Sequence, residues 1–123
     1  MKALSLKQPW AELIVSGRKT LEIRTWRTNF RGEFLIHASK VSNFKAMERL
    51  GFKDLPTGCI VGKAKVVDVK EYDSLEEFEK DSDKHFAKGH DWPGKLYGFV
   101  VEDAQRLKEL PLKGKLNFFE VEI

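Results

Sequence analysis

The segment from Gly17 to Arg24 gathers ionisable side chains where the chain leaves a turn and enters an expected strand. Glu22 and Arg24 are two positions apart, so in a strand they share one face and can pair directly. The turn at Gly17 delivers Lys19 beside that face. A lysine and an arginine bind phosphate or a base carbonyl, and a glutamate between them orients them or accepts from an exocyclic amine. The segment therefore predicts an anion-binding site that contains a carboxylate.

The same three residues allow other roles. Neighbouring Arg18 and Arg24 favour a neutral Lys19, which would make it a base or nucleophile, whereas Glu22 favours its ammonium form. In that case Lys19 and Glu22 would be catalytic. A third alternative is a salt bridge that only closes the mouth of a barrel.

Aromatic and polar residues flank this segment. Trp10 and Trp26 lie near basic groups and are candidates for stacking on a base, and Gln8 is a candidate for reading its hydrogen-bonding edge. The alternative for Trp10 is a core position on the first helix. His37 and Lys40, at the end of a strand, are expected at the rim of the cleft, although His37 also suits a hydrogen-bonded core position.

The charge is uneven along the chain. Residues 1–45 carry nine basic and three acidic residues, a net charge of +6. Residues 68–83 carry eight acidic and two basic residues, a net charge of −6. A basic N-terminal third favours an anionic ligand, with RNA or a nucleotide as the first candidate. The alternative is an ordinary solvated surface.

The composition limits the class of protein. A chain of 123 residues, 41% hydrophobic and 33% charged, suits one soluble domain with its own core. No apolar run approaches the ~20 residues of a membrane span. The single cysteine, Cys59, favours a reducing cytoplasm and a buried structural thiol. His85 and His90 lack further ligands at metal spacing, so we expect an exposed loop there and no metal or cofactor. The oligomeric state is not indicated.

Hydrophobic periodicity predicts an α+β fold. Helices are expected from Pro9, over 44–50 and over 74–84, and a loop over 85–95 whose residues 92–95 could form a lid over the cleft. Strands are expected over 2–6, 20–24, 33–38, 59–71, 96–102, 106–112 and 118–121.

Six blocks in order carry a family resemblance that spans nearly the whole chain. They include a Gly-x-Lys-x-x-Glu-x-Arg core, and they lie at residues 4–11, 17–26, 31–40, 58–62, 96–101 and 114–121. The pattern strongly resembles the ASCH (activating signal cointegrator homology) domain. The resemblance implies a single PUA-like domain over 1–123, a small β-barrel of six or seven strands with two or three short helices.

The resemblance also implies a function. ASCH domains are thought to bind RNA or nucleotides in a cleft beside the core motif, and this is the leading interpretation here. Some bacterial relatives deacetylate N4-acetylcytidine with a lysine, a threonine three residues later and a distant glutamate, and a ribonuclease activity is known for another member. This chain has Lys19 but Glu22 in place of that threonine, and Glu71, Glu76 and Glu77 are candidates for the distant carboxylate. A small hydrolase is therefore the alternative, and a protein-interaction adaptor is a third.

Overall fold

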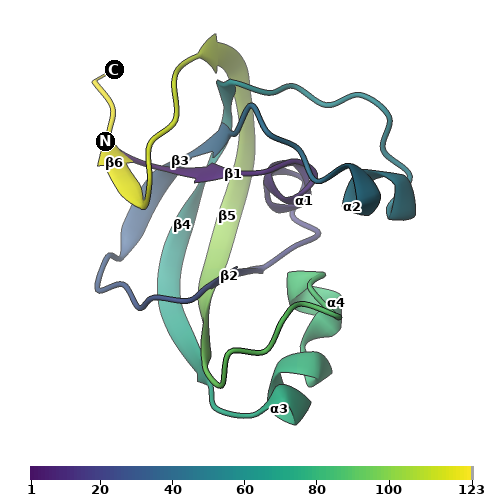
Figure 1. Cartoon of the computed structure of the whole chain (residues 1–123). Coiled ribbons are helices and arrows are strands. Elements are labelled where there is room, and N and C mark those ends of the chain that lie inside the picture. The colour runs from purple at the N-terminus through teal and green to yellow at the C-terminus, as the bar shows by residue number, and fades with distance from the viewer. Residues whose placement is uncertain (123) are drawn as a thin grey trace.

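The computed structural model describes residues 1–122, whose strands form one mixed sheet (Figure 1). The strand order is β2-β5-β4-β3-β1-β6, in which β1 and β3 are parallel and the other neighbours antiparallel. The strands are β1 (Lys2–Leu6), β2 (Leu21–Arg24), β3 (Gly32–Ala38), β4 (Cys59–Tyr72), β5 (Leu96–Pro111) and β6 (Phe118–Glu120). The helices are α1 (Trp10–Val15), α2 (Phe44–Arg49), α3 (Leu75–Lys80) and α4 (Ser82–His85). The α+β class is confirmed, with six strands in the described chain and four short helices there rather than two or three.

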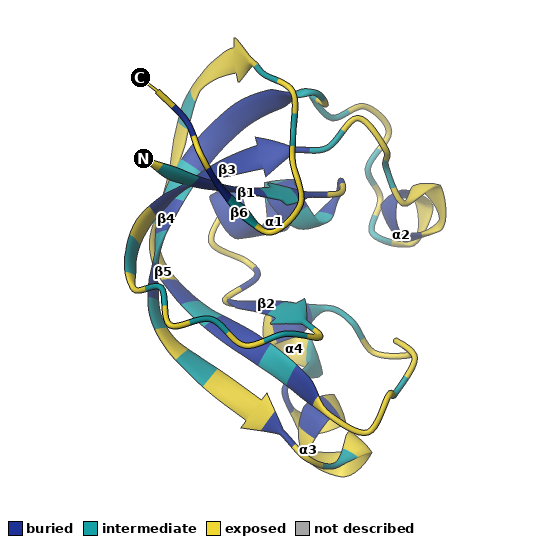
Figure 2. Ribbon diagram, turned by 60° about the vertical axis from the view of Figure 1, so that its left-hand side comes forward, coloured by how far each residue is buried: buried dark blue, intermediate teal, exposed yellow. Residues whose placement is uncertain are grey.

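The two longest strands, β4 and β5, pair antiparallel and form the curved centre of the sheet (Figure 2). The prediction of two separate strands over 96–102 and 106–112 is wrong, because β5 runs unbroken through both. Asp103 has a φ of 54°, and the register against β4 shifts between Lys63 and Lys65. A bulge of this kind bends a strand while the hydrogen-bonded ladder continues, whereas a turn would end it.

The curled sheet brings its two edges together through aromatic side chains. Phe118 of β6 lies 6.0 Å, centroid to centroid, from Trp26, which follows β2. The Phe118 ring also contacts Phe30 at 4.9 Å and Phe34 at 5.9 Å. Within residues 1–122 the edge strands β2 and β6 are not paired with each other, so the barrel is only partly closed.

Helix α1 packs against the sheet and buries four residues there: Ala11, Leu13, Ile14 and Val15. Its close approach depends on Gly62 in β4. A Cβ at this position would lie 2.5 Å from the Gln105 carbonyl oxygen and 2.8 Å from Val15 Cγ2, so a larger residue would push the helix away. This contact lets the C-terminal end of α1 pack closely on β4.

Residues 73–95, here called the α3–α4 lobe, pack at the opposite end of the β4–β5 pair. The expected helix over 74–84 is two short helices, and its predicted N-cap is confirmed because Ser74 Oγ accepts from the Glu77 amide at 3.2 Å. His85 is wrongly predicted as an exposed loop residue. It ends α4, is fully buried and stacks on Phe78 with ring centroids 4.1 Å apart. No helix in the described chain is long and apolar enough to cross a membrane.

Candidate functional site: a basic pocket above the Glu22–Arg24 pair

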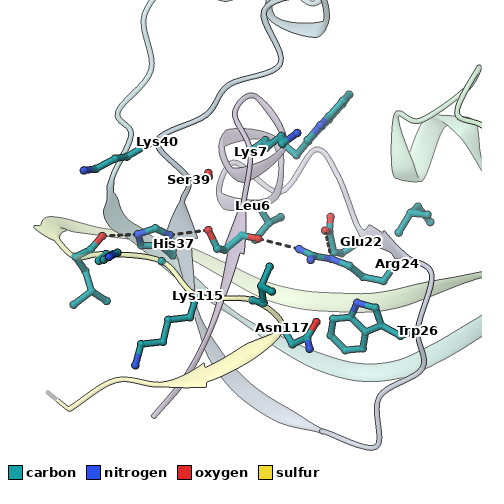
Figure 3. Close-up of a pocket in the computed structure, with 17 residues that line it drawn as sticks. Leu6, Lys7, Glu22, Arg24, Trp26, His37, Ser39, Lys40, Lys115 and Asn117 are labelled. Carbon is teal, nitrogen blue, oxygen red and sulfur yellow. Dashed lines mark hydrogen bonds and ion pairs between the residues drawn. The ribbon is translucent and has the colours of Figure 1, made fainter.

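A pocket of about 750 Å³ opens where β1 ends and α1 begins (Figure 3). Strand β2 contributes one wall, and the residues just after β3 and the β5–β6 loop complete the rim. The lining residues are Ser5, Leu6, Lys7, Trp10, Glu22, Ile23, Arg24, Trp26, His37, Ser39, Lys40 and 112–117. A cavity of this volume is large enough for a nucleotide-sized ligand.

Glu22 and Arg24 form the wall on β2. As the strand alternation predicts, they share a face, and Arg24 Nε donates to Glu22 Oε2 at 2.9 Å. Arg24 Nη2 also donates to the Ser5 carbonyl of β1 at 3.0 Å, and its guanidinium carbon lies 5.9 Å from the centre of the Trp26 ring. These contacts hold the guanidinium in one orientation beside the carboxylate.

Lys19 lies behind this wall and does not line the pocket. Its ammonium donates to the carbonyls of Leu21 at 2.6 Å and His85 at 2.8 Å, and it lies 3.5 Å from Glu22 Oε1. Burial lowers the pKa of Lys19 below its ordinary value, although the charge of Glu22 opposes that shift. The side chain is 4% exposed. Lys19 therefore fixes the position of Glu22 and donates no hydrogen bond into the pocket.

Both predicted tryptophans line the pocket. Trp10 is half-buried, and the Lys19 ammonium lies 5.8 Å from its ring centre. Trp26 is also half-buried and packs edge-on against Phe99, with centroids 5.2 Å apart. Trp26 lies beside Arg24 in Figure 3, and its ring centre is 5.9 Å from the guanidinium carbon. Each tryptophan therefore combines a packed part with a part that borders the pocket.

His37 ties the β5–β6 loop to the floor of the pocket. Its Nε2 donates to the Leu112 carbonyl at 2.6 Å, and its Nδ1 is 2.9 Å from Ser5 Oγ. The ring is almost fully buried, so His37 is a hydrogen-bonded core histidine, and it also contributes to the lining of the pocket. Gly114 lies directly on it, since a Cβ there would be 2.7 Å from His37 Cε1.

Four lysines surround the mouth: Lys7, Lys40, Lys113 and Lys115. All are exposed, and none forms an ion pair with another residue of the described chain. Sequence reasoning identified Lys40 and missed the others. The Lys-Gly-Lys run at 113–115, between two strands, was the available signal.

Several predicted residues lie elsewhere. Gln8 is fully buried, donates to the Pro56 carbonyl at 2.9 Å, accepts from the Glu12 amide at 3.0 Å and does not line the pocket. Residues 92–95 do not form a lid, because Trp92 packs on Phe78 in the α3–α4 lobe.

The three candidates for a distant carboxylate also lie outside the pocket. Glu71 pairs with Lys95 at 3.4 Å, and Glu76 pairs with Lys80 at 3.6 Å. Glu77 is exposed in the first turn of α3. Glu22 is the one carboxylate among the residues that line the pocket in the described chain.

The curled mixed sheet with its basic pocket defines a class of small α+β domain, and comparison with known proteins identifies which one. The ASCH domain model matches residues 4–108, so the chain belongs to the ASCH domain family.

The chain is 28% identical over 138 residues to activating signal cointegrator 1 of Mus musculus and of Homo sapiens. These alignments cover 97% of this chain and 22% of each relative, so the chain spans about a fifth of their length.

Solved structures support the same fold. The crystal structure of ASCH from Zymomonas mobilis matches with a TM-score of 0.68, at 19% identity, over 90% of this chain and 73% of that one. Two mutants of that protein match with TM-scores of 0.69 and 0.70 at the same identity. At this level of identity the likeness concerns the fold alone.

Proposed function

We propose that this ASCH domain binds RNA or a nucleotide, with a base in the pocket and phosphate at its lysine-rich mouth. The observation that carries the proposal is the lining of the pocket: four exposed lysines, two tryptophans and a polar wall in one concave site. Single-stranded nucleic acid is typically bound by this combination of positive charge and stacking surfaces.

The two kinds of group have separate roles. The Glu22–Arg24 pair is nearly neutral in sum, so the lysines at the mouth supply the net positive potential that attracts phosphate. Trp10 and Trp26 supply aromatic surface for a base, and stacking contributes about 1–3 kcal/mol per base.

Binding of a short fluorescein-labelled single-stranded RNA, followed by anisotropy at several salt concentrations, tests the proposal. The double variant Lys40→Gln/Lys115→Gln is expected to weaken binding and to reduce the salt slope by about 0.7 for each lost phosphate contact. The double variant Lys80→Gln/Lys84→Gln removes the same charge from the α3–α4 lobe and is expected to leave the slope unchanged. Equal losses in both double variants would show that binding reflects net charge alone.

A hydrolase acting in the same pocket is the second candidate. It is favoured by one observation: Lys19 is buried, its pKa is lowered, and it lies 3.5 Å from the carboxylate of Glu22. In this alternative Glu22 touches the substrate and transfers the proton, and Lys19 tunes it.

Incubation of the wild-type protein with N4-acetylcytidine and, separately, with RNA tests the hydrolase, with products followed by chromatography. Turnover that is lost in Glu22→Gln, in a variant whose melting curve shows it is folded, would support the enzyme. Binding without turnover of either substrate would leave the binding domain as the function.

A further inference from the structure

The wall of the pocket on β2 presents a carboxylate and a guanidinium side by side, and both have hydrogen-bonding capacity left over. We propose that this pair makes the pocket selective for guanine over the other bases. The inference rests on the proposed function, because it names the base that the same pocket would take.

Glu22 has acceptor sites to spare. An ionised carboxylate accepts hydrogen bonds only and offers about four lone-pair sites on its two oxygens. Arg24 Nε occupies one site at 2.9 Å, and the Lys19 ammonium lies 3.5 Å from the other oxygen. The side chain is 9% exposed and lines the pocket, so its remaining exposed surface is where a ligand could meet it.

Arg24 has donors to spare. A guanidinium carries five N–H groups. One goes to Glu22 and another to the Ser5 carbonyl, while the side chain remains 21% exposed at the pocket wall. The wall thus offers free carboxylate acceptor sites next to a guanidinium donor, and both groups are held in place before any ligand arrives.

Guanine has the complementary edge. Its N1–H and exocyclic N2–H₂ are neighbouring donors that suit one carboxylate, and its O6 is an adjacent acceptor that suits a guanidinium. Adenine and cytosine place a ring-nitrogen acceptor beside their amine, which would face the Glu22 carboxylate without a proton between them. Uracil has one ring N–H between two carbonyl acceptors. Each of these three bases places an acceptor atom against the Glu22 carboxylate, where it has no donor and is repelled by the negative charge. That mismatch opposes binding.

The rest of the pocket suits this pose. Trp10 and Trp26 line the same pocket as the pair, and Trp26 lies beside Arg24 (Figure 3), so aromatic surface is available to a base whose edge meets the carboxylate. Lys40 and Lys115 stand at the mouth, where the sugar–phosphate of that base would leave the pocket. The hydrogen bonds between the Glu22–Arg24 pair and the base edge determine which base binds, and the lysines contribute affinity without sequence preference.

A panel of 5′-monophosphates binding to the unaltered protein, measured by calorimetry at low salt, tests the inference without any mutation. GMP is expected to bind about 10-fold more tightly than AMP, CMP or UMP, the size of one good bidentate contact. IMP keeps N1–H and O6 but lacks the N2 amine, so its affinity is expected to fall between GMP and the rest.

The outcomes separate the two proposals. Equal affinity for all five nucleotides, or IMP equal to GMP, would overturn guanine selectivity and leave nucleotide binding standing. Binding of none of them, nor of single-stranded RNA, would overturn both.

A pair of carboxylate-to-amide variants localises the selectivity. Glu22→Gln replaces one acceptor by a donor and is expected to abolish the preference for GMP over AMP. Asp81→Asn makes the same change in the α3–α4 lobe and is expected to retain it. If Glu22→Gln fails to fold, the nucleotide panel still decides the question. A GMP preference that survives in folded Glu22→Gln would contradict the assignment to Glu22.

Discussion

Asp81 and Glu22 are each paired with two basic side chains, yet of the two only Glu22 lines the basic pocket. Asp81 in the α3–α4 lobe accepts from the Tyr72 hydroxyl at 2.5 Å and the Lys70 ammonium at 2.6 Å, and Lys84 lies 3.9 Å away. Glu22 accepts one hydrogen bond, from Arg24, and has Lys19 beside its other oxygen. The contacts that join α3 and α4 to β4 occupy most of the hydrogen-bond acceptor sites of Asp81. Glu22 keeps free acceptor sites at the wall of the pocket.

A buried carboxylate paired with basic side chains is therefore not by itself a sign of a functional site. In both clusters burial and charge shift pKa values: burial lowers that of Lys19, and burial with the Asp81 hydrogen bond raises that of Tyr72. The difference is access, because the pocket meets the Glu22 side of its cluster.

The largest effect is expected from removing the buried lysine. Lys19→Met keeps the aliphatic volume but leaves Glu22 without its second cation and two carbonyls without a donor, so the free energy of unfolding should fall by about 3 kcal/mol. Lys70→Met removes a half-exposed partner of Asp81 and should cost no more than about 1 kcal/mol. Urea denaturation measures both. Similar losses would mean that the two clusters are energetically alike.

Removing the Asp81 carboxylate is expected to lower the stability of the protein without changing its affinity for RNA. Asp81→Ala leaves the buried Tyr72 hydroxyl without its acceptor and should lower the free energy of unfolding by about 2 kcal/mol. RNA affinity at a temperature where the variant is folded should match the wild type. A clear loss of affinity would show that the lobe takes part in the site.

The tryptophans offer a matched pair, one in each region. Trp10→Leu should weaken binding of single-stranded RNA by about 10-fold, in line with the loss of one stacking surface. Trp92→Leu, in the lobe, should leave affinity unchanged. Anisotropy titrations compare them, and an unaffected Trp10→Leu would remove this ring from the proposed ligand contacts.

The smallest effect is expected for the pH dependence of the stability that Asp81 contributes. Desolvation raises the pKa of Asp81, but hydrogen bonds from Lys70 and Tyr72 and the charges of Lys70 and Lys84 outweigh it, so the pKa is lowered overall. A carboxyl with a lower pKa in the folded state stabilises the protein above about pH 4, the value in unfolded chains, and loses that contribution as the pH falls through the folded value. The stability gap between the wild type and Asp81→Asn should therefore narrow below about pH 4, as unfolding curves at pH 7, 4 and 3 would measure. A difference in the free energy of unfolding that stays constant over this pH range would contradict the link between the lowered pKa of Asp81 and stability.

Much of the framework follows from local pattern. The alternation over 20–24 predicted that Glu22 and Arg24 share a face, and the apolar runs predicted β3 and β4 within a few residues. These features depend on neighbours along the chain, which the sequence displays directly. The bulge at Asp103, which makes β5 one strand, depends instead on pairing with β4 and was missed.

The sequence by itself determined the ASCH fold class and the cluster of Lys19, Glu22 and Arg24 at and just before one strand. Only the tertiary structure decided which of these groups a ligand could meet. Lys19 points away from the pocket because its ammonium donates a hydrogen bond to the His85 carbonyl, 66 residues away. The loop carrying Lys113 and Lys115 reaches the rim because His37 donates to the Leu112 carbonyl. Exposure and hydrogen-bond partners are set by contacts between distant segments, and local periodicity carries no record of them.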